Sequence, residues 1–150
     1  DVGYRADLVF WDWKTKFRSP RGASTLAASV DSKGGWQASR CRVREGQEFE
    51  FSAAGKWTVD VNSEQVDADG AEDGSGRLLG VLFDSDKYEL GEPFELGTYG
   101  DWTAPADGEL FLRCNDEWAK IDDGNAGKVS FRIKLKGSGN PLPKPTTDDR

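Results

Sequence analysis

Hydrophobic and polar residues alternate with a period of two along most of the chain, and no long stretch places apolar residues at helical spacing. Neighbouring side chains of a strand point to opposite faces, so this alternation is typical of strands with one face in the core and one in water. The pattern predicts strands over residues 7–13, 35–43, 47–53, 56–61, 76–83, 93–96, 108–114 and 128–135.

Turn residues separate the predicted strands, with glycine at Gly46, Gly55, Gly100 and Gly108 among others. About eight strands at this spacing predict an all-β fold, a β-sandwich of the jelly-roll type. Residues 14–34 lack a clear period, so we expect an exposed loop there, with room for one helical turn at 25–28.

Several strands carry charge on the face opposite their apolar residues. We expect Phe49 and Phe51 to point into the core, and Glu48 and Glu50 to face water. The last predicted strand has the same pattern, which places Lys134 on its outward face.

Length and composition favour one domain over residues 1–136, followed by a flexible Pro- and Gly-rich tail or linker over 137–150. A net charge of −7 disfavours nucleic acid as a partner, and no apolar run approaches the ~18 residues of a membrane span. The chain begins at Asp1 without a visible signal peptide, which indicates a processed or excised segment. We expect a secreted or periplasmic protein.

The two cysteines, Cys41 and Cys114, both lie within predicted strands and leave two interpretations open. They are either two buried thiols or a disulfide, which would stabilise the fold by roughly 4 kcal/mol and imply an oxidising compartment. Two cysteines without histidine do not make a structural zinc site. The lack of histidine also removes Ser–His and Cys–His pairs, so we do not expect an enzyme.

The connection between the last two predicted strands, which we expect to be a hairpin, gathers oxygen-bearing side chains and one cation, Lys120. Those side chains belong to Asp116, Glu117, Asp122, Asp123 and Asn125. Repulsion among them would weaken a bare loop, and Ca²⁺, which takes roughly 6–8 oxygen ligands, would remove that cost. Gly124 and Gly127 let the backbone double back. The alternative is a solvated acidic loop without an ion.

A series of short motifs occurs in a fixed order: AAG at 53–55, LLG at 78–80, FELG at 94–97, APADGELFL at 104–112, ND at 115–116 and NAG at 125–127. In this order, over about residues 43–135, the chain resembles the LecA-type, calcium-dependent galactose-binding lectins. The resemblance implies a galactose-binding-domain-like jelly roll with calcium at one end. In sugar-binding members of that family, two neighbouring hydroxyls of galactose coordinate the ion.

The resemblance also implies a set of calcium ligands. Asp116 matches the carboxylate of the family's Asn-Asp pair, and Asn125 matches the amide before the final small residue and glycine. The family's oxygen ligand just before that Asn is replaced by Gly124, so Asp122 or Asp123 must supply it. The main-chain carbonyl of Lys120 matches a further ligand, and another carbonyl is expected within 61–65.

The chain departs from the family beside the sugar, where the lectins place a histidine and a glutamine. The corresponding loop, 62–76, is acidic here, with Asp67, Asp69 and Asp73. This loop is either solvated or completes the metal site. For sugar binding we expect Asp116, Asn125 and Trp118, whose ring could stack on a pyranose or else cover the end of the core.

The other tryptophans, Trp11, Trp13, Trp36, Trp57 and Trp102, are further candidates for sugar contact. For Trp11 and Trp13 the alternative is core packing. The sequence thus predicts a calcium-dependent, lectin-like module that binds galactose-like glycans. The alternative is a calcium-stabilised structural domain that packs against a neighbouring domain or subunit and binds no sugar.

Overall fold

The computed structural model describes residues 18–19, 24–33, 35–59, 64–116, 126–137 and 142, which contain strands and no helix. The strands are β1 (Leu26–Asp31), β2 (Gln37–Val43), β3 (Glu48–Thr58), β4 (Leu78–Asp84), β5 (Glu89–Leu90), β6 (Phe94–Glu95), β7 (Tyr99–Thr103), β8 (Gly108–Cys114) and β9 (Ala126–Leu135). Among these residues there is accordingly no helix long and apolar enough to cross a lipid bilayer.

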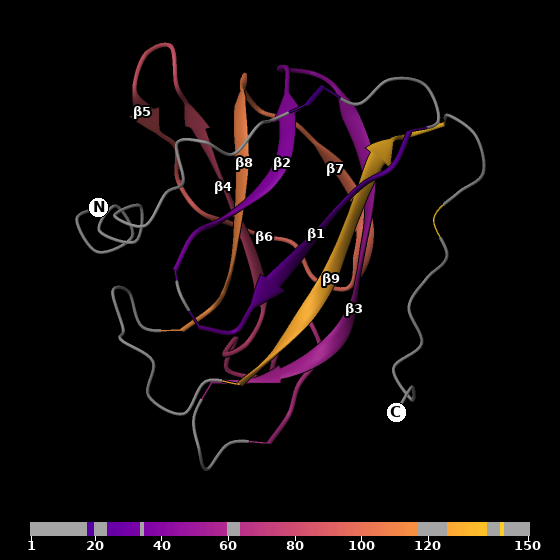
Figure 1. The fold of residues 1–150 in the computed structure, drawn as a ribbon, viewed down its shortest axis with the longest axis vertical. Helices are drawn as coiled ribbons and strands as arrows, with labels where there is room; N and C mark the ends of the chain where they lie inside the picture. Colours follow the sequence, from indigo (N-terminus) through magenta and orange to yellow (C-terminus); the bar gives the residue numbers. More distant parts are fainter. Residues whose placement is uncertain are drawn as a thin grey trace.

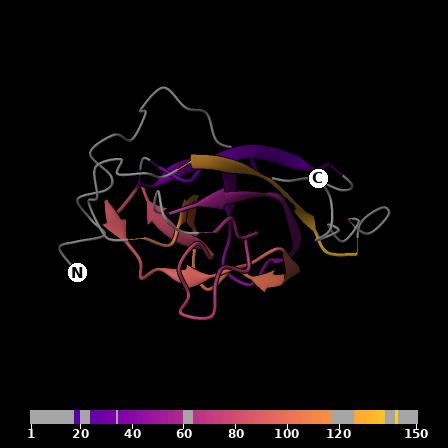
Figure 2. The same ribbon diagram turned by 90° about the horizontal axis from the view of Figure 1, so that it is seen from below.

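The strands form two antiparallel sheets (Figure 1). The first sheet has the order β1-β9-β3-β7, and the second has the order β2-β8-β4-β5, with β6 also paired to β4. β1 and β9 run side by side, diagonally across the molecule in Figure 1 and along its upper edge in Figure 2. The predicted all-β sandwich is confirmed, since both sheets contribute side chains to one core.

That core lies between the sheets and is built from the inward residues that the alternation predicts. Phe49 and Phe51 of β3 are buried, and the Phe51 ring stacks on that of Phe131 in β9, with 6.1 Å between the ring centroids. Cys41 and Val43 of β2 share the same core. Burying each large apolar side chain contributes about 1.5–3 kcal/mol, so this cluster is the main source of stability.

The second sheet is also apolar on its other face. Leu79, Val81 and Phe83 of β4 form a second buried cluster with Phe111 of β8 and Trp36. The cross-strand pair Val81–Phe111 lies at its centre. β4 therefore has apolar residues on both faces, which explains why its sequence, LLGVLF, is continuously apolar instead of alternating.

The turn predicted at Gly55 is wrong, because β3 continues through it and pairs with β9 on both sides. Gly55 has a φ of +116° and lies opposite Val129. A Cβ at this position would lie 2.8 Å from the carbonyl oxygen of Lys128. Glycine here accommodates a local distortion of a long strand and does not end the strand.

The helical turn predicted near 25–28 is also wrong, because those residues belong to β1 or precede it. β1 pairs with β9 from Leu26–Ile133 to Asp31–Lys128. Its small residues hide the strand signal, and the long partner β9 determines the conformation.

β7 was not predicted, since Gly100 was interpreted as a turn. In the structure Gly100 lies in a strand opposite Phe51, and a Cβ there would be 3.4 Å from the Phe51 ring. A Cβ would thus make an ordinary van der Waals contact, and pairing with β3 determines the strand conformation here.

The outward face of the first sheet is less exposed than the alternation predicts. Glu50 and Lys134 are opposite each other on β3 and β9, and both are buried. The Lys134 Nζ lies 3.4 Å from Oε1 of Glu50. The expectation that both side chains face water is therefore wrong, and their pairing offsets part of the cost of removing two charges from water.

Two predictions fall on residues outside those described. The predicted strand 7–13, with Trp11 and Trp13, lies entirely there. In the predicted tail the structure describes residue 137 and Leu142, whose side chain is buried. The domain division at 136 and the flexible tail stay predictions.

Candidate ion-binding and sugar-binding site

The connection that was expected to bind calcium does not join two strands of one sheet. It begins after β8, in the second sheet, and ends at β9, in the first sheet. The prediction of a hairpin is therefore wrong, because the connection crosses from one layer of the sandwich to the other. The described residues at its two ends are Asp116, itself an expected ligand, and Ala126. The other expected ligands lie between them in the sequence.

Of those ligands the structure describes Asp116, whose side chain is half-buried. Lys120, Asp122, Asp123 and Asn125 lie outside the described residues, and so does Trp118. Within the described part of the chain, no group of three acidic, Cys or His residues could hold a metal ion. An ion site at this end would consequently need ligands from the 117–125 segment.

The start of the connection is held firmly by the residue before Asp116. The backbone N–H of Asn115 donates to the carbonyl of Arg77 at 2.8 Å, and the Asn115 carbonyl accepts from the N–H of Gly76 at 2.9 Å. The Asn115 side-chain amide donates to the Gly74 carbonyl at 2.7 Å. Three hydrogen bonds therefore attach Asn115 to the connection between β3 and β4, which is described over residues 64–77 and is called the 64–77 loop below. Asp116 follows Asn115 directly.

The end of the connection is held at the buried Ser32. The Ser32 N–H donates to the Gly127 carbonyl at 3.0 Å, and its hydroxyl donates to the carbonyl of Thr58, the last residue of β3. The Ser32 oxygen also lies 4.0 Å from the sulfur of Cys114, the last residue of β8. Ser32 thus lies between the two strands that the connection joins.

Trp57 supports the 64–77 loop from inside the core. Its indole N–H donates to the Gly76 carbonyl at 2.6 Å, and its backbone exchanges two hydrogen bonds with Val66. Gly76 has a φ of +81°, and a Cβ there would approach a methyl of Val66 to 2.5 Å. Glycine is therefore required where the loop passes over Trp57.

Three aspartates of the 64–77 loop, the acidic loop predicted at 62–76, accept hydrogen bonds that stabilise the loop. Asp67 accepts from the N–H of Asp69, and Asp69 accepts from both the N–H and the hydroxyl of Thr98 at 2.9 and 3.1 Å. Asp73 accepts from the N–H of Ser75, and hydrogen bonds from Ser75 lower the pKa of Asp73. These contacts give each of the three aspartates a structural role in the loop.

The loop does lie beside the Asp116 end, through the contact between Gly74 and Asn115. The possibility that its carboxylates complete a metal site stays a prediction, because the other expected ligands, within 117–125, lie outside the described residues. In the segment expected to supply a further carbonyl, residues 61–63 lie outside the described residues, and Glu64 and Gln65 are exposed.

A buried cation lies near the same end. Arg113 is 5% exposed, donates from Nε to the Cys114 carbonyl at 3.0 Å, and lies 5.8 Å from the centroid of the Trp36 ring. Burial lowers the pKa of Arg113 to about 10, and the negative charge of Asp116 acts in the opposite direction. The charges of Asp116 and Arg113 thus interact at this end of the sandwich.

The described tryptophans do not form an exposed platform for a sugar. Trp36 and Trp57 are buried, and the half-buried Trp102 stacks on Phe49 and Phe94 with centroid distances of 5.7 and 5.2 Å. Trp36 and Trp57 therefore pack inside the apolar clusters, and Trp102 packs against one of them.

The two cysteines are both buried and are not joined in a disulfide. Cys41 lies in the core, where burial raises the pKa of its thiol to about 12. Of the two interpretations that the sequence left open, the structure supports two buried thiols.

Sequence reasoning missed the roles of Asn115 and Ser32, which hold the two ends of the connection. It also missed a pair of hollows at the opposite end of the sandwich, lined by residues of the turns near 45, 85 and 106. Asn115 was noticed as part of a motif, but its partners could not be deduced from the sequence.

The comparisons with known proteins agree with this architecture. No family model matches the chain, and no curated protein sequence matches it. Among solved structures, the chain is similar to the N-terminal domain of EclA, described as a PllA-like lectin, with a TM-score of 0.55 and 20% sequence identity. The match covers 74% of this chain and 96% of that domain. At this identity the similarity shows the fold alone: the chain has the β-sandwich fold of a lectin domain.

Proposed function

We propose that the chain is a calcium-dependent carbohydrate-binding module for galactose-like glycans. The observation that carries the proposal is the position of Asp116. It directly follows Asn115, which three hydrogen bonds attach to the neighbouring loop, in a fold similar to that of a PllA-like lectin domain. This is a binding role, and it assigns no catalytic group.

In this proposal the oxygens of the connection hold one Ca²⁺. Asp116, Asp122, Asp123 and Asn125 would contribute side-chain oxygens, and Lys120 would contribute its main-chain carbonyl. Bound Ca²⁺ accepts further oxygen ligands, which neighbouring hydroxyls of a sugar can provide.

Asp116 and Asn125 would also accept hydrogen bonds from the hydroxyls of the bound sugar, and the Trp118 ring would stack against the apolar face of the pyranose. The hydrogen bonds at Asn115 and Ser32 support this proposal because they fix both ends of the connection before any ligand binds. Such fixed ends reduce the entropy that binding must remove.

Calcium sites of extracellular modules commonly have dissociation constants of about 10⁻⁴–10⁻³ M. Such a site is filled where calcium is abundant, so we propose a secreted or periplasmic location. The partner would then be a glycan or polysaccharide displayed on a surface or released into the medium.

The proposal is tested on a glycan array read with calcium and with EDTA. We expect the chain to bind galactose-terminated glycans in calcium and to lose this binding in EDTA. The variant Asp116→Ala should bind calcium at least about tenfold more weakly. Asp101→Asn is a suitable control, because it also changes one acidic residue but lies on β7.

Two outcomes would count against sugar recognition. Tight calcium binding with no signal on the array would favour a calcium-stabilised structural domain that contacts a neighbouring domain or subunit. Equal array signals in calcium and EDTA would instead show that glycan binding does not depend on an ion at this loop.

A further inference from the structure

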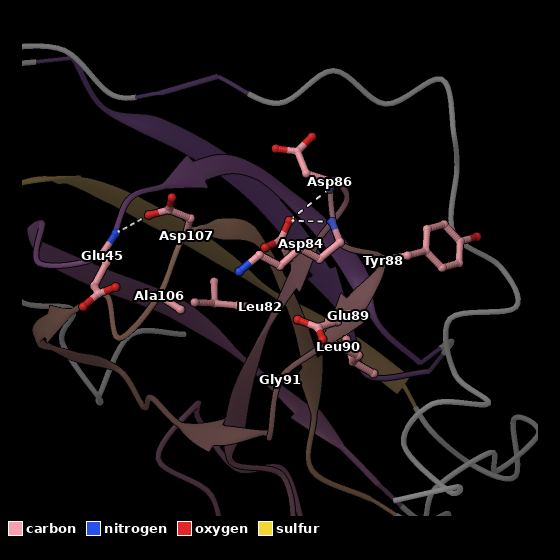
Figure 3. A pocket seen from close by; sticks show the side chains of 11 residues that line it. Glu45, Leu82, Asp84, Asp86, Tyr88, Glu89, Leu90, Gly91, Ala106 and Asp107 are labelled. Atoms are coloured by element: carbon pink, nitrogen blue, oxygen red, sulfur yellow. Dashed lines mark hydrogen bonds between the residues drawn. The ribbon is translucent and has the colours of Figure 1, made fainter.

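Two adjoining hollows lie at the end of the sandwich opposite Asp116. The larger, of about 560 Å³, is bordered by the β4–β5 turn and the turn before β8, and the smaller, of about 300 Å³, continues toward β2. Asp84, Asp86 and Asp107 line both. Figure 3 shows Glu45 and Asp107 on one side of the larger hollow and Asp84 on the other. Small-molecule sites commonly have volumes in this range.

The smaller hollow is lined by a buried carboxylate with an unused acceptor. Glu109 is 4% exposed, and its Oε2 accepts from the Ser85 hydroxyl at 3.0 Å and lies 3.2 Å from the Arg42 guanidinium. Both of these partners also line the hollow. The other oxygen, Oε1, is buried and has no hydrogen-bond donor in the described structure. Such an oxygen is costly to bury, and a ligand that brings a donor would remove the cost.

The charges around the two hollows favour a cation. Six carboxylates line them, those of Glu45, Asp84, Asp86, Glu89, Asp107 and Glu109. Three cations accompany them, Arg42, Arg44 and Lys87, so the lining has a net charge of −3. An excess of one sign in a concave site attracts ligands of the other sign.

The carboxylates that lie between the hollows each keep an oxygen for a ligand. Asp84 uses Oδ1 to accept from the N–H groups of Asp86 and Lys87, and Asp107 uses Oδ1 to accept from the N–H of Glu45. Their second oxygens accept no hydrogen bond from any residue described here. Ligands rich in N–H and O–H donors therefore suit this lining.

The rest of the lining narrows the ligand class. Leu82, Leu90 and Ala106 add apolar surface to the larger hollow, which suits the C–H face of a ring. A metal ion fits less well, because the described residues contain no group of three that could hold one. The ligand should then combine a positive charge, several donors and an apolar face.

We propose that these hollows form a second binding site, which takes the primary ammonium group of a deacetylated amino sugar at the Glu109 carboxylate. The hydroxyls of the sugar would donate to the second oxygens of Asp84 and Asp107. This site is independent of the calcium site proposed at the other end, and it does not require the chain to bind galactose.

The test is isothermal titration of the protein with glucosamine hydrochloride in EDTA at about pH 6, where a primary amine of this kind is charged. N-acetylglucosamine and N-α-acetyl-lysine amide serve as comparison ligands, because one lacks the charge and the other lacks the sugar ring. We expect glucosamine to bind at least about tenfold more tightly than either. EDTA separates this result from any failure of the calcium-dependent proposal.

Three variants locate the site. Glu109→Gln should lower glucosamine affinity about tenfold or more, because it removes the charge that pairs with the ammonium group. Asp84→Asn should lower it less, because Asp84 would accept from a neutral hydroxyl. Asparagine keeps the oxygen that caps the turn, so this variant should stay folded. Asp101→Asn removes the same charge far from the hollows and should leave affinity unchanged. Circular dichroism checks that each variant is folded. If Glu109→Gln unfolds the chain, Asp84→Asn decides the question.

The proposal is wrong if glucosamine does not bind, or if N-acetylglucosamine binds equally well. It is also wrong if the lysine analogue binds more tightly than glucosamine, which would indicate a peptide ligand. Equal loss of affinity in Glu109→Gln and Asp101→Asn would show a general charge effect and no defined site.

Discussion

The two ends of this sandwich are both acidic, but their carboxylates do different things. At the Asp116 end, Asp67, Asp69 and Asp73 accept hydrogen bonds that hold the 64–77 loop. At the opposite end, Glu109 is buried with one oxygen that has no donor among the described residues. Acidic composition is similar at both ends, but among the described carboxylates Glu109 alone has a buried oxygen without a hydrogen-bond partner.

This difference shows how an acidic loop should be assessed. A carboxylate whose oxygens already accept hydrogen bonds from neighbouring residues is explained by the local fold, as Asp69 is by the bonds from the N–H and the hydroxyl of Thr98. A buried oxygen without a donor needs another explanation, and a ligand is one. Substitutions at matched positions of the two ends can test this distinction.

The largest expected effect is on the free energy of unfolding, when one aromatic residue at each end is replaced by alanine. Trp57→Ala should destabilise the fold by about 3–5 kcal/mol, because it removes a fully buried ring and the donor to Gly76. Tyr88→Ala, at the opposite end, should cost less than about 1 kcal/mol, since this side chain is 66% exposed. Urea unfolding measures both. Equal destabilisation would contradict the view that the two ends are built differently.

The next effect compares one aspartate at each end. Asp69→Ala should cost about 2 kcal/mol, because the N–H and hydroxyl of Thr98 both lose a charged acceptor. Asp86→Ala should change the free energy of unfolding by less than about 0.5 kcal/mol, because this side chain is exposed in a turn. A larger loss for Asp86→Ala than for Asp69→Ala would reverse the assignment of structural and available carboxylates.

A smaller effect is expected in the titration of Asp73. Hydrogen bonds from Ser75 lower the pKa of this carboxyl, so its contribution to stability is present above the ordinary pKa of aspartate. That contribution is lost as the pH falls through the lowered pKa of the folded state. NMR titration should show Asp73 below the ordinary value, and Ser75→Ala should bring it partly back. A pKa at or above the ordinary value would mean that the loop is not held in this way.

The smallest expected effect is the reaction of the native thiols. Cys41 lies in the core with its pKa raised to about 12, so little of its thiolate forms at pH 8. Cys114 is buried beside Ser32, so a reagent in solution has little access to it. A thiol reagent such as DTNB should detect almost no cysteine in the folded protein and both after unfolding. If unfolding releases no reactive thiol, the cysteines form a disulfide and the description of this core is wrong.

The fold could be predicted from the sequence where bulky apolar residues alternate with polar ones. Phe49 and Phe51 in β3, and Val129 and Phe131 in β9, are buried as the alternation predicts. The prediction failed where pairing with a neighbouring strand overrides a local turn signal. Gly100 pairs with Phe51 of β3, so a residue that is typical of turns lies inside β7.

The candidate site was harder to predict than the fold. The expected ligand Asp116 came from a motif, and the structure places it at an anchored position beside Asn115. The contact of Asn115 with Gly74 joins residues 41 positions apart, and it depends on sheet pairing that alternation does not fix.

The hollow at Glu109 was missed for the same reason. The ion pair between the buried Glu109 and the exposed Arg42 needs Arg42 on β2 to lie opposite Glu109 on β8, and periodicity cannot determine that register. In the sequence, Glu109 appears only as a polar residue in an apolar strand.

The most direct test of the proposed calcium site is a diffraction map of crystals grown or soaked in calcium, with anomalous data to identify the ion. We predict one calcium peak about 2.3–2.6 Å from a carboxylate oxygen of Asp116, with further oxygens from the 117–125 segment around it. Disordered solvent beside Asp116, or a calcium ion bound instead among Asp84, Asp86 and Asp107, would contradict the account.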